Sequence, residues 1–217
     1  KSQLKKHCSP AAISAYHLRA SKWFAENDLI DEALQHAIAA NDIEYAVWLV
    51  EQHHDELLNK EQWNRLDRWI QLFPPEVVAE QPSLLAARGF YFESCGRIAE
   101  LYATLDRIAR LLSTISPDSP ACGQVHGEYY ALLTERQFFS SEPKSTIASY
   151  QQAMRLLPPK AQHGKFIATI FGSLSFAVNG DSDQGLRLIY ECLDRPSMFQ
   201  IVDPWKLHQC LCLYHEF

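Results

Sequence analysis

The chain has 217 residues, of which 47% are hydrophobic and 12% aromatic, and its formal net charge is -6. This composition excludes a disordered chain and is sufficient for one sizeable core or a run of stacked repeats. The negative charge argues against a nucleic-acid or anionic-membrane surface, because binding phosphate groups requires clustered positive charge. No apolar run approaches the roughly 20 residues that a membrane span needs. The cysteines include no C-x-x-C pair, which predicts reduced, mostly buried thiols and a cytoplasmic protein.

Apolar residues keep helical spacing from Ala11 almost to the end of the chain, and they nowhere alternate long enough to predict a strand. Residues 1–10 are interpreted as the tail of a preceding module or a linker. Because the first residue is Lys1 instead of Met, we expect a piece of a longer protein. Residues 11–217 are then a single helical repeat domain, truncated at its C-terminal end.

The spacing predicts helices over residues 11–27, 29–40, 42–58, 61–73, 75–80, 82–95, 97–112, 121–139, 143–157, 163–178, 184–193 and 205–217. Asp28 or Asp31 is expected to cap the second of these helices. Loops are predicted at 113–120 and 196–204, where Ser, Asp and Pro cluster. Prolines close the helix pairs roughly every 40 residues, a period typical of helical-hairpin repeats.

Several stretches align in register, each with a small residue, an aromatic residue one turn later, a Gly or Asp turn, and an apolar stripe. The first set is Ser21, Phe24, Asp28, Ile30, Ala33, Ala37 and Ala40. The second set is Gly89, Phe92, Gly96, Ile98, Leu101, Leu105 and Ile108. The third set is Ser173, Phe176, Gly180, Ser182, Gly185, Ile189 and Cys192. Thr146, Tyr150, Ala153 and Pro158 supply the last part of a fourth.

These residues resemble the tetratricopeptide pattern, in the form found in MalT-like regulators, which are large bacterial transcription activators of the LuxR type. Residues 20–51 are similar to the segment that follows the ATPase and winged-helix modules of that family. Residues 61–78, EQWNRLDRWIQLFPPEVV, resemble its next motif, a tryptophan-bearing helix that ends at prolines. The resemblance covers nearly all of the chain from Ser14. It implies an all-α fold of tetratricopeptide-like helical hairpins, stacked as a right-handed superhelix or α-solenoid.

The resemblance also implies a sensor segment, whose groove binds a small inducer or a regulatory protein between a nucleotide-binding switch and a DNA-binding module. The sequence departs from the full family plan in two respects. It contains no G-x-x-x-x-G-K-[ST] phosphate loop, and no DNA-reading helix pair follows Trp205. We therefore assign no ATP binding, no cofactor and no direct nucleic-acid contact to these residues.

Other chemistry is weakly indicated. His208, Cys212 and His215 share one helix face, but three residues fall short of the four ligands of a structural zinc site, so no metal is predicted. His53 and His54 point to different sides of a helix and are expected to face solvent. Since the sequence contains no nucleophile elbow, paired-carboxylate signature or phosphate loop, the protein is not predicted to be an enzyme.

A ligand or partner groove is the sharper hypothesis, because the first helix of each stacked pair lines the concave surface. The register places six candidate binding residues on that surface: Phe90, Glu93, Tyr129, Arg136, Trp205 and His208. Aromatic and charged side chains together suit a sugar, a small aromatic acid or a peptide. The alternative is that the aromatic candidates are core and the charged ones solvated. A pure protein-interaction scaffold with no small-molecule site is the alternative function.

Overall fold

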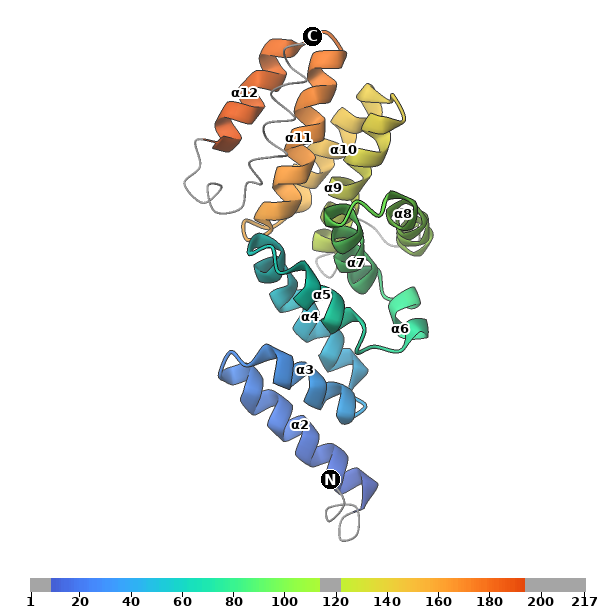
Figure 1. Cartoon of the computed structure of the whole chain (residues 1–217), viewed down its shortest axis with the longest axis vertical. Helices are drawn as coiled ribbons and strands as arrows, with labels where there is room; N and C mark the ends of the chain where they lie inside the picture. Colours follow the sequence, from blue (N-terminus) through green and yellow to red (C-terminus); the bar gives the residue numbers. More distant parts are fainter. Residues whose placement is uncertain (1–8, 114–121, 194–217) are drawn as a thin grey trace.

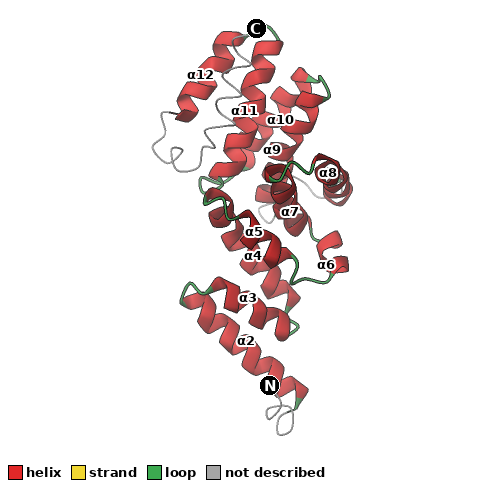
Figure 2. Cartoon of the chain, in the orientation of Figure 1, coloured by secondary structure: helices red, strands yellow, loops and turns green. Residues whose placement is uncertain are grey.

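The structure is a computed structural model that describes residues 9–113 and 122–193. Within these ranges the secondary structure is entirely helical and no strand occurs, so the chain is all-α, as predicted (Figure 2). The helices are α2 (Pro10–Glu26), α3 (Ile30–Ala39), α4 (Ile43–Asn59), α5 (Trp63–Ile70), α6 (Pro75–Glu80), α7 (Pro82–Ser94), α8 (Ile98–Leu112), α9 (Gly123–Phe139), α10 (Pro143–Leu156), α11 (Gln162–Val178) and α12 (Ser182–Leu193). Each predicted helix up to residue 193 is confirmed. The one predicted over 205–217 lies outside the described residues.

Consecutive helices pack in pairs: α2 with α3, α4 with α5, α7 with α8, α9 with α10, and α11 with α12. The pairs follow one another along the long axis of the molecule, from α2 at one end to α12 near the other (Figure 1). The short helix α6 links the second and third pairs. None of the described helices combines the length and apolar character that crossing a membrane requires.

The turn inside each pair has the same backbone geometry. Asp28, Gly96 and Gly180, which the register aligns, all have positive φ angles, of 59°, 66° and 92°. In these three turns, and in the turn between α9 and α10, the residue after the left-handed position donates its backbone N–H to the carbonyl five residues earlier. The N–O distances are 2.8–3.0 Å, for Leu29 to Phe24, Arg97 to Phe92, Glu142 to Gln137, and Asp181 to Phe176. This hydrogen bond, next to a residue in the left-handed region, ends a helix without leaving its last carbonyls unsatisfied.

Two further positions extend this rule. Ser141, in the turn between α9 and α10, has a φ of 58°, although this turn contains no glycine. Glu61, between α4 and α5, has a φ of 54°, and Gln62 N donates to Leu57 O at 2.9 Å. The turn of every helix pair therefore adopts the left-handed conformation, whether or not the residue there favours it.

The small residues of the register lie where helices approach closely. Ser21 and Ser173 are fully buried, and Ser21 Oγ donates to the carbonyl of Ala33 across the first pair at 2.5 Å. A Cβ added to Gly89 would come within 2.7 Å of the Leu132 side chain. The predicted role of these positions as helix-crossing points is confirmed.

Three local predictions are wrong. Neither Asp28 nor Asp31 caps α3, whose N-cap is Leu29 with no side-chain hydrogen bond. Asp28 instead adopts the left-handed turn conformation, and Asp31 accepts hydrogen bonds from Arg65 and Trp69 of α5. The apolar pattern of the first predicted helix also places Trp23 in the helix interface, but 56% of this residue is exposed. Of the described cysteines, Cys95 is exposed and the other two are half-buried; none forms a disulfide.

The first helices of different pairs also contact one another. Helix α4 contacts α7 and α11, and α9 contacts both α7 and α11. At the junction, Asn59 Nδ2 of α4 donates to the carbonyl of Lys160, and Asn59 Oδ1 accepts from the backbone N–H of His163, at 2.8 and 3.0 Å. These contacts join residues more than 100 positions apart and bring α11 back against α4.

Candidate functional site

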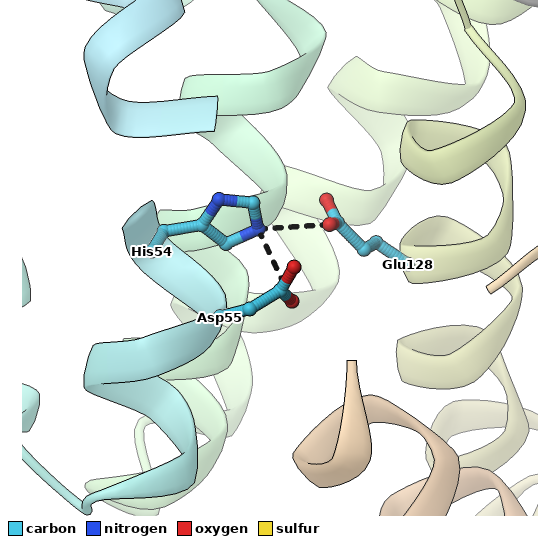
Figure 3. Close-up of side chains that lie close together, drawn as sticks. All are labelled: His54, Asp55 and Glu128. Atoms are coloured by element: carbon cyan, nitrogen blue, oxygen red, sulfur yellow. Dashed lines mark hydrogen bonds and ion pairs between the residues drawn. The ribbon is translucent and has the colours of Figure 1, made fainter. Parts of the chain in front are cut away.

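Two acidic side chains and one histidine meet between α4 and α9 (Figure 3). His54 and Asp55 come from α4, and Glu128 comes from α9. Within the described ranges, these residues form the one group whose potential metal-ligating atoms all lie within 4.8 Å of one another. His54 Nε2 lies 2.8 Å from Glu128 Oε1 and 3.8 Å from Asp55 Oδ1. We call these three residues the HDE cluster.

The amphipathic pattern of each helix places the cluster inside. His54 follows Val50 by one turn and precedes Leu57 and Leu58, so it falls on the apolar stripe of α4. Both His54 and Glu128 are only 2% exposed. The prediction that His54 faces solvent is therefore wrong, because α9 packs across that stripe.

Two hydrogen bonds fix the imidazole of His54. Its Nδ1 lies 3.0 Å from the backbone carbonyl of Val50, which can only accept, so Nδ1 carries a proton. Its Nε2 consequently points at Glu128, as the dashed lines in Figure 3 indicate. The backbone of α4 thus sets both the tautomer and the ring orientation.

The electrostatics favour a charged imidazole in the absence of other ligands. Burial by itself would lower the pKa of His54, but the charge and hydrogen bond of Glu128, the charge of Asp55 and the Val50 carbonyl together raise it to about 9. His54 is therefore protonated at neutral pH, and its charge is balanced by a carboxylate from another helix.

Neighbouring groups complete the network. Gln124, one turn before Glu128 on α9, donates its amide to Glu128 Oε1 at 2.8 Å and to Asp55 Oδ2 at 2.9 Å. Lys160 Nζ lies 3.3 Å from Asp55 Oδ2 and donates to the carbonyl of Gln52. The Lys160 side chain is 45% exposed, so it approaches the cluster from the solvent side.

A pocket of about 190 Å³ opens beside the cluster. It is lined by Glu51, Gln52, His54, Ser83, Gln124, Val125 and Glu128. Residues of α4, α7 and α9 contribute to it, so a molecule in this pocket would touch three helix pairs at once. The polar lining suits a small polar ligand, a cation or ordered water.

Phe90 and Glu93 are not on an open surface. Phe90 is 1% exposed and packs edge-on against the ring of His163, at a centroid distance of 5.7 Å. Glu93 is buried as well, and its Oε2 lies 3.7 Å from His163 Nε2. The prediction that both residues lie on an open concave surface is therefore wrong, because the first turn of α11 covers this face of α7.

Tyr129 and Arg136, unlike Phe90 and Glu93, are only half-buried. Tyr129 is half-buried beside Tyr130, and burial raises the pKa of its hydroxyl. Arg136 donates to Asp106 of α8 at 2.5 Å and lies over the ring of Tyr102. The structure therefore does not bring these two residues together with Phe90 and Glu93 into one site. Whether any of the four binds a ligand stays a prediction.

The remaining candidates, Trp205 and His208, lie outside the described residues, as do Cys212 and His215. Sequence reasoning missed the HDE cluster because Glu128 lies 74 positions after His54, although Asp55 is its neighbour. One signal was present: a histidine on an otherwise apolar helix stripe requires a buried partner.

Comparison with known proteins gives one kind of match. No protein-family model and no solved structure matches the chain. Over 151 residues, 68% of this chain, the sequence is 39% identical to the serine/threonine-protein kinase PknK of Mycobacterium tuberculosis and to PknK of Mycobacterium bovis. The match covers 14% of these curated relatives. Most of this chain is therefore similar to a small segment of a much longer protein.

Proposed function

We propose that this chain is a non-catalytic sensing and interaction segment of a cytoplasmic bacterial transcriptional regulator of the MalT-like class. Its helix pairs form a tetratricopeptide-like stack that winds as a right-handed superhelix. Two observations support this architecture: a left-handed turn that recurs within every described pair and again at Asn41 between the first two pairs, and small buried residues at aligned crossing points. A stack of this kind presents the first helix of each pair on its inner face.

The observation that carries the sensing role is the polar pocket beside the HDE cluster. It lies between α4, α7 and α9, which belong to three different helix pairs. An effector bound there makes contacts that depend on how these pairs are arranged. By binding one arrangement more tightly than another, it shifts the population of the stack toward that arrangement. Flanking nucleotide-binding and DNA-binding modules of the longer protein would receive this change.

The similarity to PknK agrees with a segment of a multidomain protein, since the match covers 14% of that protein. PknK is a serine/threonine-protein kinase by name, and in this proposal its phosphoryl transfer belongs to parts of PknK outside the match. In this proposal the present segment takes a small inducer or a regulatory protein as partner and contacts no nucleic acid directly.

A pocket-filling variant tests the sensing role. Ser83→Phe places an aromatic ring in the pocket, and Ser140→Phe makes the same change on an exposed turn. In the full-length protein, thermal shift and calorimetry against a panel of small polar metabolites should identify a ligand whose binding Ser83→Phe abolishes and Ser140→Phe preserves. If no metabolite binds, or if both variants bind equally, the small-molecule role is wrong.

A pure interaction scaffold is the second candidate, and exposed aromatic residues favour it. Trp23, Trp48 and Phe139 are each about half exposed or more, and such side chains are enriched at protein interfaces. Under this alternative, Trp48→Ser weakens binding of a regulatory protein, measured by calorimetry with the purified pair, while Ser83→Phe leaves it unchanged.

A further inference from the structure

The HDE cluster concentrates two carboxylates and an oriented imidazole in a buried position, next to a pocket that solvent can enter. We propose that His54 Nε2, Asp55 Oδ1 and Glu128 Oε1 bind one divalent transition-metal cation of the Zn²⁺ class. This site adjoins the pocket proposed above for the effector and shares His54 and Glu128 with it, but the proposal does not rest on the effector, because it requires only the cation and the side chains of α4 and α9.

The separations between donor atoms fit a single small cation. Zinc binds nitrogen and carboxylate oxygen at about 2.0–2.2 Å, so two ligands in a tetrahedral arrangement lie about 3.4 Å apart. The two distances from His54 Nε2, 2.8 Å to Glu128 and 3.8 Å to Asp55, lie on either side of that value. Lengthening the first distance by about 0.6 Å and shortening the second by about 0.4 Å would bring both to that value, and all three donor atoms already lie within 4.8 Å of one another.

The orientation of His54 suits a ligand. Metal-bound histidines commonly donate the second ring N–H to a carbonyl or carboxylate, which fixes the ring and raises its basicity. His54 Nδ1 has this arrangement with the Val50 carbonyl on the preceding turn of α4. Nε2 is thereby directed at the carboxylates, where either a proton or a metal cation can occupy its lone pair.

The charge balance changes in a defined way when the cation binds. The metal displaces the Nε2 proton of His54 to solvent and is neutralised by Asp55 and Glu128. Lys160 is then a surplus positive charge, and its half-exposed side chain can withdraw into water. Gln124 already contacts both carboxylates, and turning its amide by 180° presents an oxygen to the cation.

The pocket supplies the remaining requirement, which is access. Its volume of about 190 Å³ accommodates water molecules that complete the coordination shell. One imidazole nitrogen with carboxylate oxygens suits Zn²⁺ and similar ions, whereas Ca²⁺ and Mg²⁺ prefer oxygen ligands alone. The site therefore selects for the transition metal over the more abundant hard cations.

The test uses the purified full-length protein and the metal alone, so failure of the proposed effector site would not affect it. After chelator treatment, Zn²⁺ is titrated by calorimetry in two buffers of different ionisation enthalpy. We expect about one Zn²⁺ bound per chain, with release of about one proton at pH 7 as His54 gives up its Nε2 proton. Co²⁺ in place of Zn²⁺ should give visible absorption bands typical of nitrogen and oxygen ligands.

Three variants make the outcome decisive. His54→Gln and Glu128→Gln should each weaken Zn²⁺ binding by about tenfold or more, since each removes a ligand. His53→Gln, on the adjacent half-buried position of α4, should leave affinity and proton release unchanged. Circular dichroism establishes that each variant is folded; if His54→Gln is not, the near-isosteric Glu128→Gln decides alone. Absence of stoichiometric binding, or equal loss in His53→Gln, overturns the proposal.

Discussion

The first helix pair and the inner region around α4 both contain a histidine in a close polar contact, but the contacts differ in kind. In the first pair, Nδ1 of His36 lies 3.0 Å from Nδ1 of His17, and both side chains are half-buried. In the inner region, Nε2 of His54 lies 2.8 Å from a carboxylate oxygen of Glu128, and both are fully buried. The first contact joins neighbouring helices, whereas the second joins different helix pairs.

The pKa values of His36 and His54 are shifted in opposite directions. Burial and the nearby charge of His17 lower the pKa of His36, whereas the carboxylates around His54 raise its pKa although its burial is deeper. The charge of the contacting group, and not the depth of burial, therefore decides which protonation state of each histidine folding favours. The comparison also separates local packing from the contacts that hold distant pairs together.

The largest effect is expected from breaking the inner contact. Glu128→Ala leaves His54 without its closest counter-charge in a buried site, and loss of one partner of such a pair costs about 3–5 kcal/mol of unfolding free energy. His17→Ala, the matching change in the first pair, should cost much less, because that contact is half-exposed and involves no carboxylate. Urea unfolding measures both. Equal costs for the two variants would contradict the comparison.

The next effect is on alkaline stability. The folded-state pKa of His54, about 9, lies above the value of about 6.5 in an unfolded chain, so folding binds a proton. This stabilisation is complete below about pH 6.5 and is lost as the pH rises through 9, by on the order of 3 kcal/mol. Urea unfolding of the chelator-treated protein between pH 6.5 and 9.5 measures it. A His54→Gln variant with the same pH profile as the parent protein would refute this assignment.

A smaller effect concerns the turn that both regions share. Asp28→Gly in the first pair and Ser141→Gly between α9 and α10 each remove a side chain from a left-handed position. Each should raise the free energy of unfolding by about 0.5–1 kcal/mol, because glycine adopts this conformation without steric cost. Gly96→Ala is the reverse control: a Cβ there meets no atom within 4 Å, so any destabilisation comes from the backbone alone.

The smallest effect is expected in acid. The lowered pKa of His36 means that folding favours its neutral form, so this stabilisation is present above the ordinary pKa near 6.5 and is lost as the pH falls below it. His36→Gln should lessen the loss of stability between pH 7 and pH 5, measured by urea unfolding. A variant that loses as much stability as the parent protein would show that His36 does not titrate in this way.

The helices and their turns were predictable because both depend on local sequence. Apolar spacing identifies each described helix, and Gly96 and Gly180 mark turns by their residue type. Ser141 gives no such signal, and its turn is predicted only by the gap between the helices that end at residue 139 and begin at Pro143. Asp31 could not be assigned from sequence, because its hydrogen-bond partners belong to the next helix pair.

The site was less predictable, since it depends on how pairs are arranged around one another. The repeat register predicts an open concave position for Phe90, because it describes each first helix together with its own pair only. The return of α11 against α4 covers that face, and the periodicity of a single helix contains no information about it. Burial of His54 could be inferred from its position on an apolar stripe, but its pairing with Glu128 could not.

The contact between α4 and α9 also has a consequence for how the chain is made. Ribosomes extend a chain at about 5–20 residues per second, so α4 is complete several seconds before Glu128 has been synthesised. During this interval His54 and Asp55 lack their partner from α9, whereas the first helix pair already has all of its internal contacts. Early helix pairs can therefore form as they emerge, and the long-range contacts around α4 must form late. A chain released early would contain native helices whose inner charges remain open to water.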